Sequence, residues 1–124
     1  MSLAEYFESI KGIGVLATSD SDGNVNTAIY SRPYIIDDNT VAFSMLERLS
    51  YANIRSNPKA AYMFIESGQG YAGKRMYLTM TGEEKDPDKI KTIKQQHERA
   101  KDDDGKIRHM IYFTVDRTRP LVGG

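Results

Sequence analysis

Apolar and polar residues alternate along much of this chain with the two-residue period of half-buried strands. The alternation predicts strands over 13–19, 24–32, 40–45, 59–66, 74–83 and 107–115. In the second strand, Val25, Thr27 and Ile29 share one face, and Asn26, Ala28 and Tyr30 share the other. In the last strand, the odd positions are predicted to face inward: Ile107, Ile111, Phe113 and Val115.

Three other segments have the spacing of helices. The segment 2–10 begins with Ser2 as an N-cap, and 46–57 is closed by Pro58. The segment 86–105 has a capping aspartate, a proline in its first turn and a glycine at its end. Its apolar stripe is Ile90, Ile93, His97 and Ala100. The sequence therefore predicts short helices at three crossings between strands.

The order of these elements predicts one domain over residues 1–124. Its fold class is mainly β with short helices, as a six-stranded antiparallel β-barrel that is closed or nearly closed. Asp22-Gly23 is suited to a tight hairpin between the first two strands, and 34–39 is expected to turn after Pro33. An open sheet with helices on one face is the alternative.

Composition narrows the classes of function. Lys plus Arg and Asp plus Glu number 17 each, a balance that gives no sign of a nucleic-acid or acidic-membrane partner. The chain has no cysteine, which excludes thiolate metal sites and cysteine nucleophiles. No signal peptide or membrane-spanning run is recognisable. We expect a cytoplasmic protein without a metal site.

The stretch GQGYAG, Gly68 to Gly73, matches the glycine fingerprint of dinucleotide-binding loops. That fingerprint needs a helix after the loop, because the helix N-terminus holds the phosphate. Here the pattern of a strand follows instead. The loop is therefore predicted to join two strands, with Tyr71 as an aromatic contact residue on its surface.

A better anion site is predicted at SMLERLSYANIRSNP, where a strand runs directly into a helix. Free N–H groups at a helix start attract anions. Arg48 adds a charge, Ser50 adds a hydroxyl, and Asn53 lies on the same helix face as Ser50. Arg32 is a second candidate cation. An ordinary helix start with a solvated arginine is the alternative.

Catalytic residues are not predicted. His97 lies on a helical stripe and is interpreted as a satisfied, partly buried side chain, whereas His109 is expected to line an interface or a pocket. The serines show no arrangement with histidine and aspartate that would activate a nucleophile.

Three stretches together resemble the pyridoxamine 5′-phosphate oxidase-like FMN-binding split-barrel superfamily. They are GIGVLATSDSDGNVNTAIYS, TVAFSM and RLSYANIRSNPKAAYMFIE. The resemblance runs from about Phe7 to Val115, and the size and layout are most similar to the small FMN-binding proteins of that superfamily. Many members have a lysine or arginine where this chain has Leu49, with Arg48 adjacent.

The resemblance implies a split-barrel homodimer with FMN at the interface, acting as an oxidoreductase or an electron carrier. It does not extend to the oxidase's own substrate motif near the C-terminus. The cofactor-binding residues that it implies are Asn26, Thr27, Ala28, Phe43, Ser44, Met45, Arg48, Leu49, Ser50, Asn53 and Tyr71. A split barrel that has lost FMN or binds haem or F420 is one alternative, and a purely structural dimerising barrel is another.

Overall fold

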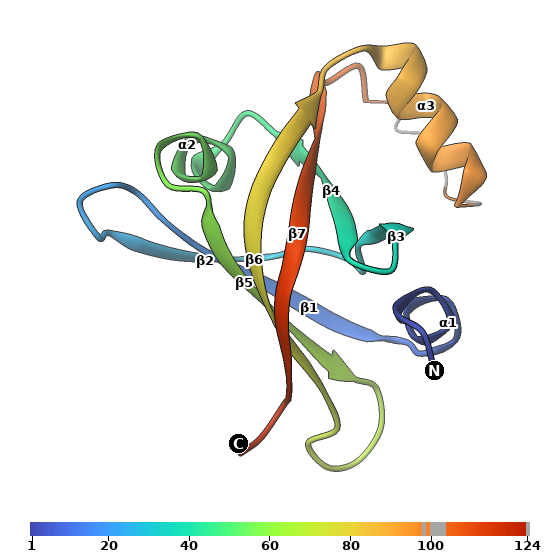
Figure 1. The fold of residues 1–124 in the computed structure, drawn as a ribbon. Helices are drawn as coiled ribbons and strands as arrows, with labels where there is room; N and C mark the ends of the chain where they lie inside the picture. Colours follow the sequence, from blue (N-terminus) through green and yellow to red (C-terminus); the bar gives the residue numbers. More distant parts are fainter. Residues whose placement is uncertain (98, 100–103, 124) are drawn as a thin grey trace.

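The computed structural model describes residues 1–97, 99 and 104–123. One antiparallel sheet dominates this part of the chain, in the strand order β2-β1-β5-β6-β7-β4-β3 (Figure 1). The elements are α1 (Leu3–Ser9), β1 (Gly12–Ser19), β2 (Val25–Ile29), β3 (Tyr34–Asp37), β4 (Thr40–Leu46), α2 (Leu49–Ser56), β5 (Lys59–Glu66), β6 (Gly73–Glu84), α3 (Pro87–Gln96) and β7 (Arg108–Pro120).

The described sheet has seven strands, so the prediction of six was wrong by one. The extra strand is β3, where a turn was expected. Tyr34 pairs with Ala42 and Ile35 pairs with Val41 in an antiparallel register. The Tyr34 side chain is buried in a cluster with Ala42, Ile90 and Met110. The gain from removing such a large apolar surface from water explains why this short segment joins the sheet.

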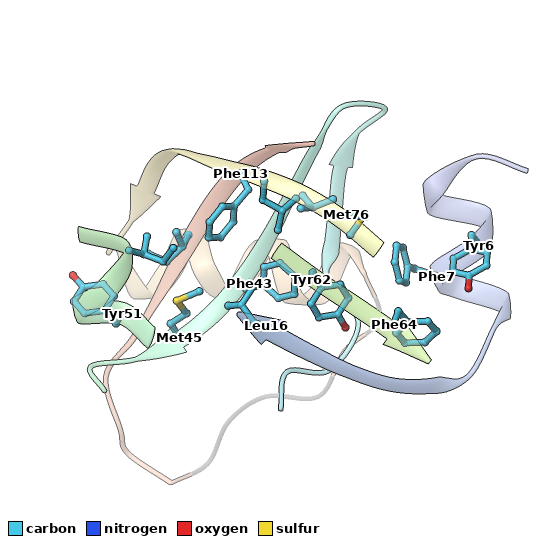
Figure 2. Packing of buried hydrophobic residues seen from close by; sticks show 14 residues of the cluster. Tyr6, Phe7, Leu16, Phe43, Met45, Tyr51, Tyr62, Phe64, Met76 and Phe113 are labelled. Atoms are coloured by element: carbon cyan, nitrogen blue, oxygen red, sulfur yellow. The ribbon is translucent and has the colours of Figure 1, made fainter. Parts of the chain in front are cut away.

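The sheet is not closed. β2 and β3 are its outermost strands, and no pairing joins them within the described residues. The sheet instead twists strongly around a single core, with α1 and α2 at opposite ends of that core (Figures 1 and 2). This arrangement confirms the split antiparallel barrel that the resemblance implied, whereas a fully closed barrel does not form among the described residues.

Several predicted boundaries move. α2 begins at Leu49 because the preceding residues up to Leu46 remain in β4. α3 ends at Gln96 instead of Gly105, and the predicted stripe position Ala100 lies outside the described residues, as do Asp102 and Asp103. Ile107 precedes β7 and is 74% exposed, so its predicted inward orientation was wrong.

The core is rich in aromatic residues. It runs from Tyr51 on α2 to Tyr6 and Phe7 on α1, with Phe43 and Tyr62 between them (Figure 2). The rings meet mostly edge to face, as in the Phe7–Phe64 pair at 5.2 Å between centroids, an arrangement favoured by the quadrupoles of aromatic rings. Both helices are therefore fixed to the sheet through this cluster.

Local capping agrees with the sequence. The Ser2 side chain accepts a hydrogen bond from the N–H of Glu5 at the start of α1. Asp86 does the same for the N–H of Asp88 at the start of α3. A second small apolar cluster, which includes Ile90 and Met110, packs α3 against β7 and β4.

Candidate functional site

The start of α2 is an uncapped helix N-terminus. Arg48 is the N-cap residue in an extended conformation, and its side chain makes no capping hydrogen bond. The first N–H groups of an α-helix have no partner within the helix. The backbone from Leu49 to Tyr51 therefore presents donors, together with the positive end of the helix dipole.

Ser50 and Asn53 share the face of α2 that lies toward β1 and β2, as their spacing predicted. Ser50 is only 4% exposed and is hydrogen-bonded to the phenol of Tyr30. The buried Asn53 amide donates to Thr18 Oγ1 at 3.1 Å. Both side chains therefore fix the helix to the first hairpin, and Ser50 does so within the first turn.

Arg48 and Leu49 lie on the outer side of this helix start and are exposed. Burial raises the pKa of the Tyr30 phenol, while the hydrogen bond with Ser50 and the positive charge of Arg48 act in the opposite direction. The Arg48 charge therefore acts close to the buried Ser50–Tyr30 pair. These groups form a cationic, donor-rich corner of the molecule.

The predicted β2 residues divide between two faces. In the register with β1, Asn26 lies opposite Thr18 and Ala28 lies opposite Leu16. Since Thr18 and Leu16 are buried, Asn26 and Ala28 face the inside, beside α2. Thr27 points to the outer face. The structure therefore brings Asn26 and Ala28 close to the helix start and leaves only the main chain of Thr27 on that side.

The predicted β4 residues also alternate. Phe43 and Met45 point into the core, whereas Ser44 is half-buried and its Oγ has no hydrogen-bond partner. Ser44 and the Phe43 ring edge a cavity of about 160 Å³. The other residues that line it are Tyr30, Ser31, Arg32, Tyr34, Lys94 and Arg108. Arg32 is thus near the site, although its guanidinium donates to the Phe7 carbonyl at 3.0 Å.

The GQGYAG loop joins β5 to β6, so a strand follows it and the dinucleotide fingerprint is excluded as predicted. Gly68, Gly70 and Gly73 have positive φ, and a Cβ at Gly73 would lie 2.0 Å from the Phe64 carbonyl oxygen. Tyr71 is exposed at the tip of this hairpin. Figure 1 places the hairpin at the end of the sheet away from α2. Within a single chain, Tyr71 is therefore remote from the other predicted site residues.

The outer face of the first hairpin carries exposed apolar side chains. Val25 is 83% exposed and Ile29 is 72% exposed, and Ile13 on β1 is also exposed. The face continues across β1 to β5, because Val15 pairs with both Ile29 and Met63. The alternation in β2 was predicted correctly, but its more apolar face points away from the core.

Larger cavities than the one beside Ser44 lie elsewhere. One of about 430 Å³ runs between α3 and the start of β7 and contains none of the predicted site residues. Among the described residues, no three histidine, aspartate or glutamate side chains gather as metal ligands. In the same part of the chain, no helix has the length and apolar character needed to cross a membrane.

Each ring nitrogen of the two histidines lies 2.8 or 2.9 Å from an oxygen atom. His97 is half-buried, with Nδ1 2.8 Å from the Ile93 carbonyl oxygen and Nε2 2.8 Å from that of Ile35, which confirms its interpretation. His109 lines neither the cavity beside Ser44 nor the one beside α3, and it is buried in a charged cluster behind α2. Sequence reasoning missed this cluster, and it also missed Tyr30 and Thr18 as partners of the helix. A signal for part of the cluster was the four-residue spacing of Tyr51 and Arg55 on α2.

No family model matches the chain, and no curated protein matches it. Solved structures do. An FMN-binding protein from Syntrophomonas wolfei subsp. wolfei superposes with a TM-score of 0.82 at 17% identity, over 99% of this chain and 86% of that one. An F420 reductase superposes with a TM-score of 0.72 at 19% identity, over 93% of this chain and 94% of that one.

A third structure is a protein from Clostridium acetobutylicum that is related to general stress protein 26 and assigned to the pyridoxinephosphate oxidase family. It gives a TM-score of 0.65 at 14% identity, over 94% of this chain and 88% of that one. At these identities the likeness establishes the fold. The chain has the split-barrel fold found in FMN-binding and pyridoxamine 5′-phosphate oxidase-like proteins.

Proposed function

We propose that this chain is an FMN-binding flavoprotein that holds the FMN phosphate at the start of α2. The observation that carries the proposal is the uncapped N-terminus of α2 with Ser50 buried in its first turn and Arg48 at its N-cap. Backbone donors, a hydroxyl and a guanidinium are the groups that bind phosphate in proteins. The structural likeness to an FMN-binding protein supports this choice of ligand.

The residues present fit such a group. Leu49 stands where a cation was expected from the resemblance, but Arg48 is exposed beside it. The unpartnered Ser44 hydroxyl and the inward-facing Asn26 offer polar contacts nearby. FMN would supply hydride and single-electron chemistry, while the chain would bind and orient it. The Asn26 amide or a β2 backbone N–H would stabilise negative charge on the ring.

We propose further that two copies complete the site. The cavity beside Ser44 is smaller than the roughly 300 Å³ at which ligand pockets usually begin. The exposed apolar face around Val25 and Ile29 offers a surface for a second copy. In that assembly, the β5–β6 hairpin with Tyr71 would reach the flavin of the partner. Oxidoreductase or electron-carrier activity and a cytoplasmic location stay predictions.

The deazaflavin F420 is the second candidate ligand, because an F420 reductase shares the fold with a TM-score of 0.72. F420 also carries a phosphate, so the same helix start would serve it. Titrations with FMN and with F420 under identical conditions separate the two, since the cognate ligand binds more tightly.

Fluorescence titration tests the proposal with FMN and with riboflavin, which lacks the phosphate. We expect FMN to bind at least about tenfold more tightly, because a charge-assisted hydrogen bond contributes about 1.5–3 kcal/mol. Arg48→Ala and Ser50→Ala should weaken the binding of FMN and leave the affinity for riboflavin unchanged. Lys91→Ala, exposed on α3, is the matched control. Equal affinity for FMN and riboflavin in all four proteins would contradict a phosphate site at the start of α2.

A further inference from the structure

A buried histidine lies between two carboxylates behind α2. His109 of β7 is 5% exposed. Its Nε2 lies 2.8 Å from Oε1 of Glu47, the residue immediately before the N-cap of α2. Its Nδ1 lies 2.9 Å from Oε2 of Glu83 on β6. The imidazole therefore connects the start of the helix to two strands of the sheet.

The helix itself contributes two more groups to this cluster. The Tyr51 ring stacks on the His109 imidazole, with 4.5 Å between centroids and 20° between planes. The Tyr51 hydroxyl donates to Glu83 Oε2 at 2.9 Å, and Arg55 donates to that hydroxyl at 3.0 Å. Tyr51 and Arg55 are four residues apart and so lie along one side of α2, whereas Glu47 precedes the helix. This side is distinct from the Ser50–Asn53 face that meets β1 and β2.

The charge state of His109 decides whether its ring attracts both Glu47 and Glu83. A neutral imidazole has one N–H, whereas an imidazolium has two. With a carboxylate oxygen at each ring nitrogen, only the imidazolium is attracted to both Glu47 and Glu83. The Nδ1 contact is an ion pair by distance without an aligned hydrogen bond. Loss of the proton would therefore place a nitrogen lone pair against a carboxylate.

The two cations of the cluster, Arg55 and Lys85, both lie beside Glu83. Arg55 lies 3.3 Å from its Oε1, and Lys85 lies 3.7 Å from its Oε2. Both cations, together with the Tyr51 hydroxyl, keep Glu83 fixed on β6 when His109 changes charge. The Glu47 side chain is largely exposed and, among the described residues, has no second hydrogen bond or ion pair, only a weaker attraction to Arg55. Release on deprotonation should therefore begin at the helix start.

We propose that His109 is a positioning residue for the start of α2. As an imidazolium it holds Glu47 and Tyr51 against β6 and β7, and so fixes the backbone N–H groups that follow Arg48. That these groups bind the FMN phosphate rests on the proposed function. The helix start is fixed while the imidazole is charged and is released when the ring loses its second proton.

NMR of the protein without ligand tests the positioning role by itself. The two histidine ring signals are assigned with His109→Gln and His97→Gln. We expect the amide shifts of Arg48 to Tyr51 to follow the titration of the His109 ring in wild type and in His97→Gln. In His109→Gln this pH-dependent movement should disappear. Amides that stay constant while the His109 ring titrates would overturn the proposal.

His97 is a matched control because it also has an oxygen at each ring nitrogen. It joins the end of α3 to β3, far from the helix start in sequence. Glu47→Gln is a second variant in case His109→Gln does not fold, because its exposed side chain removes only one contact. It should shrink the amide movement of Arg48 to Tyr51 while the His109 ring still titrates. An unchanged movement of these amide signals would contradict the positioning role of His109.

FMN affinity gives the functional consequence. The second ionisation of the FMN phosphate, near pH 6, strengthens binding as pH rises in both proteins. The effect of His109 is therefore measured as a ratio at each pH: the dissociation constant of His109→Gln divided by that of wild type. We expect this ratio to be about fivefold or more at low pH and to approach one at high pH. A ratio independent of pH would overturn the link to phosphate. No FMN binding at any pH, with the amide coupling intact, would refute the proposed function alone.

Discussion

Single glycines decide how closely strands approach the site. Gly14 on β1 accepts a hydrogen bond from the Tyr30 N–H at 3.0 Å. The Tyr62 hydroxyl crosses the same point to donate to the Tyr30 carbonyl at 3.1 Å. A Cβ at Gly14 would lie 1.8 Å from that hydroxyl and 2.3 Å from that carbonyl oxygen. The absence of a side chain at position 14 thus lets Tyr30 reach Ser50.

Gly14→Ala should therefore destabilise the protein by about 1–3 kcal/mol, as expected when a tightly packed position is overfilled. Urea denaturation measures the change. Gly82→Ala is the matched control, since the nearest atom to a Cβ there is 4.0 Å away, and it should stay within about 0.5 kcal/mol of wild type. Equal stability of the two variants would contradict this account of Gly14.

Asp20 gives the first hairpin a pH dependence. Hydrogen bonds from the Asn24 side chain and backbone lower the pKa of its carboxyl below the usual value. A lowered folded-state pKa means that the carboxylate stabilises the fold above its unfolded-state pKa, and that this is lost as pH falls through the folded value. Asp20→Ala should melt below wild type at pH 7. The gap should narrow at pH 3, and a gap that widens on acidification would contradict the assignment.

At the scale of elements, α1 closes one end of the barrel. Phe7 is buried among the core aromatics, and Tyr6 donates to Glu66 at 2.6 Å. Phe7→Ala should cost about 3–5 kcal/mol, the usual loss for a buried phenylalanine. Glu8→Ala, exposed on the same helix, should change little in the same denaturation experiment. A small effect of Phe7→Ala would show that α1 is a dispensable addition.

Local sequence patterns predicted the helices and strands better than the contacts between them. The first hairpin does turn at the predicted place, because turn chemistry is local. Its central residues are Ser21 and Asp22, since the Gly23 N–H donates to the Asp20 carbonyl at 3.2 Å and Gly23 follows at positive φ. The shared face of Ser50 and Asn53 was likewise predictable from helical spacing. The contact of His109 with Glu47 joins residues 62 apart, and no local period encodes it. Alternation in β2 could not tell which face is inside, because it specifies two faces without specifying their neighbours.

At the scale of the whole molecule, the open sheet leaves an apolar outer face around Val25 and Ile29. Ile29→Glu should convert the proposed dimer to a monomer, because burying an unpaired carboxylate in an interface is costly. Sedimentation velocity measures the mass in solution. Ile107→Glu alters an equally exposed isoleucine near α3 and should leave the dimer intact. A wild-type monomer, or equal effects of the two variants, would contradict the proposed interface.

We place the phosphate of FMN at the start of α2. Mapping amide chemical shifts while FMN is added tests this placement, because the method reports location independently of affinity. We expect the largest changes on Leu49 to Tyr51, with a second group on Asn26 to Ala28. Saturable changes centred on the large cavity between α3 and β7, or no changes at all, would contradict it.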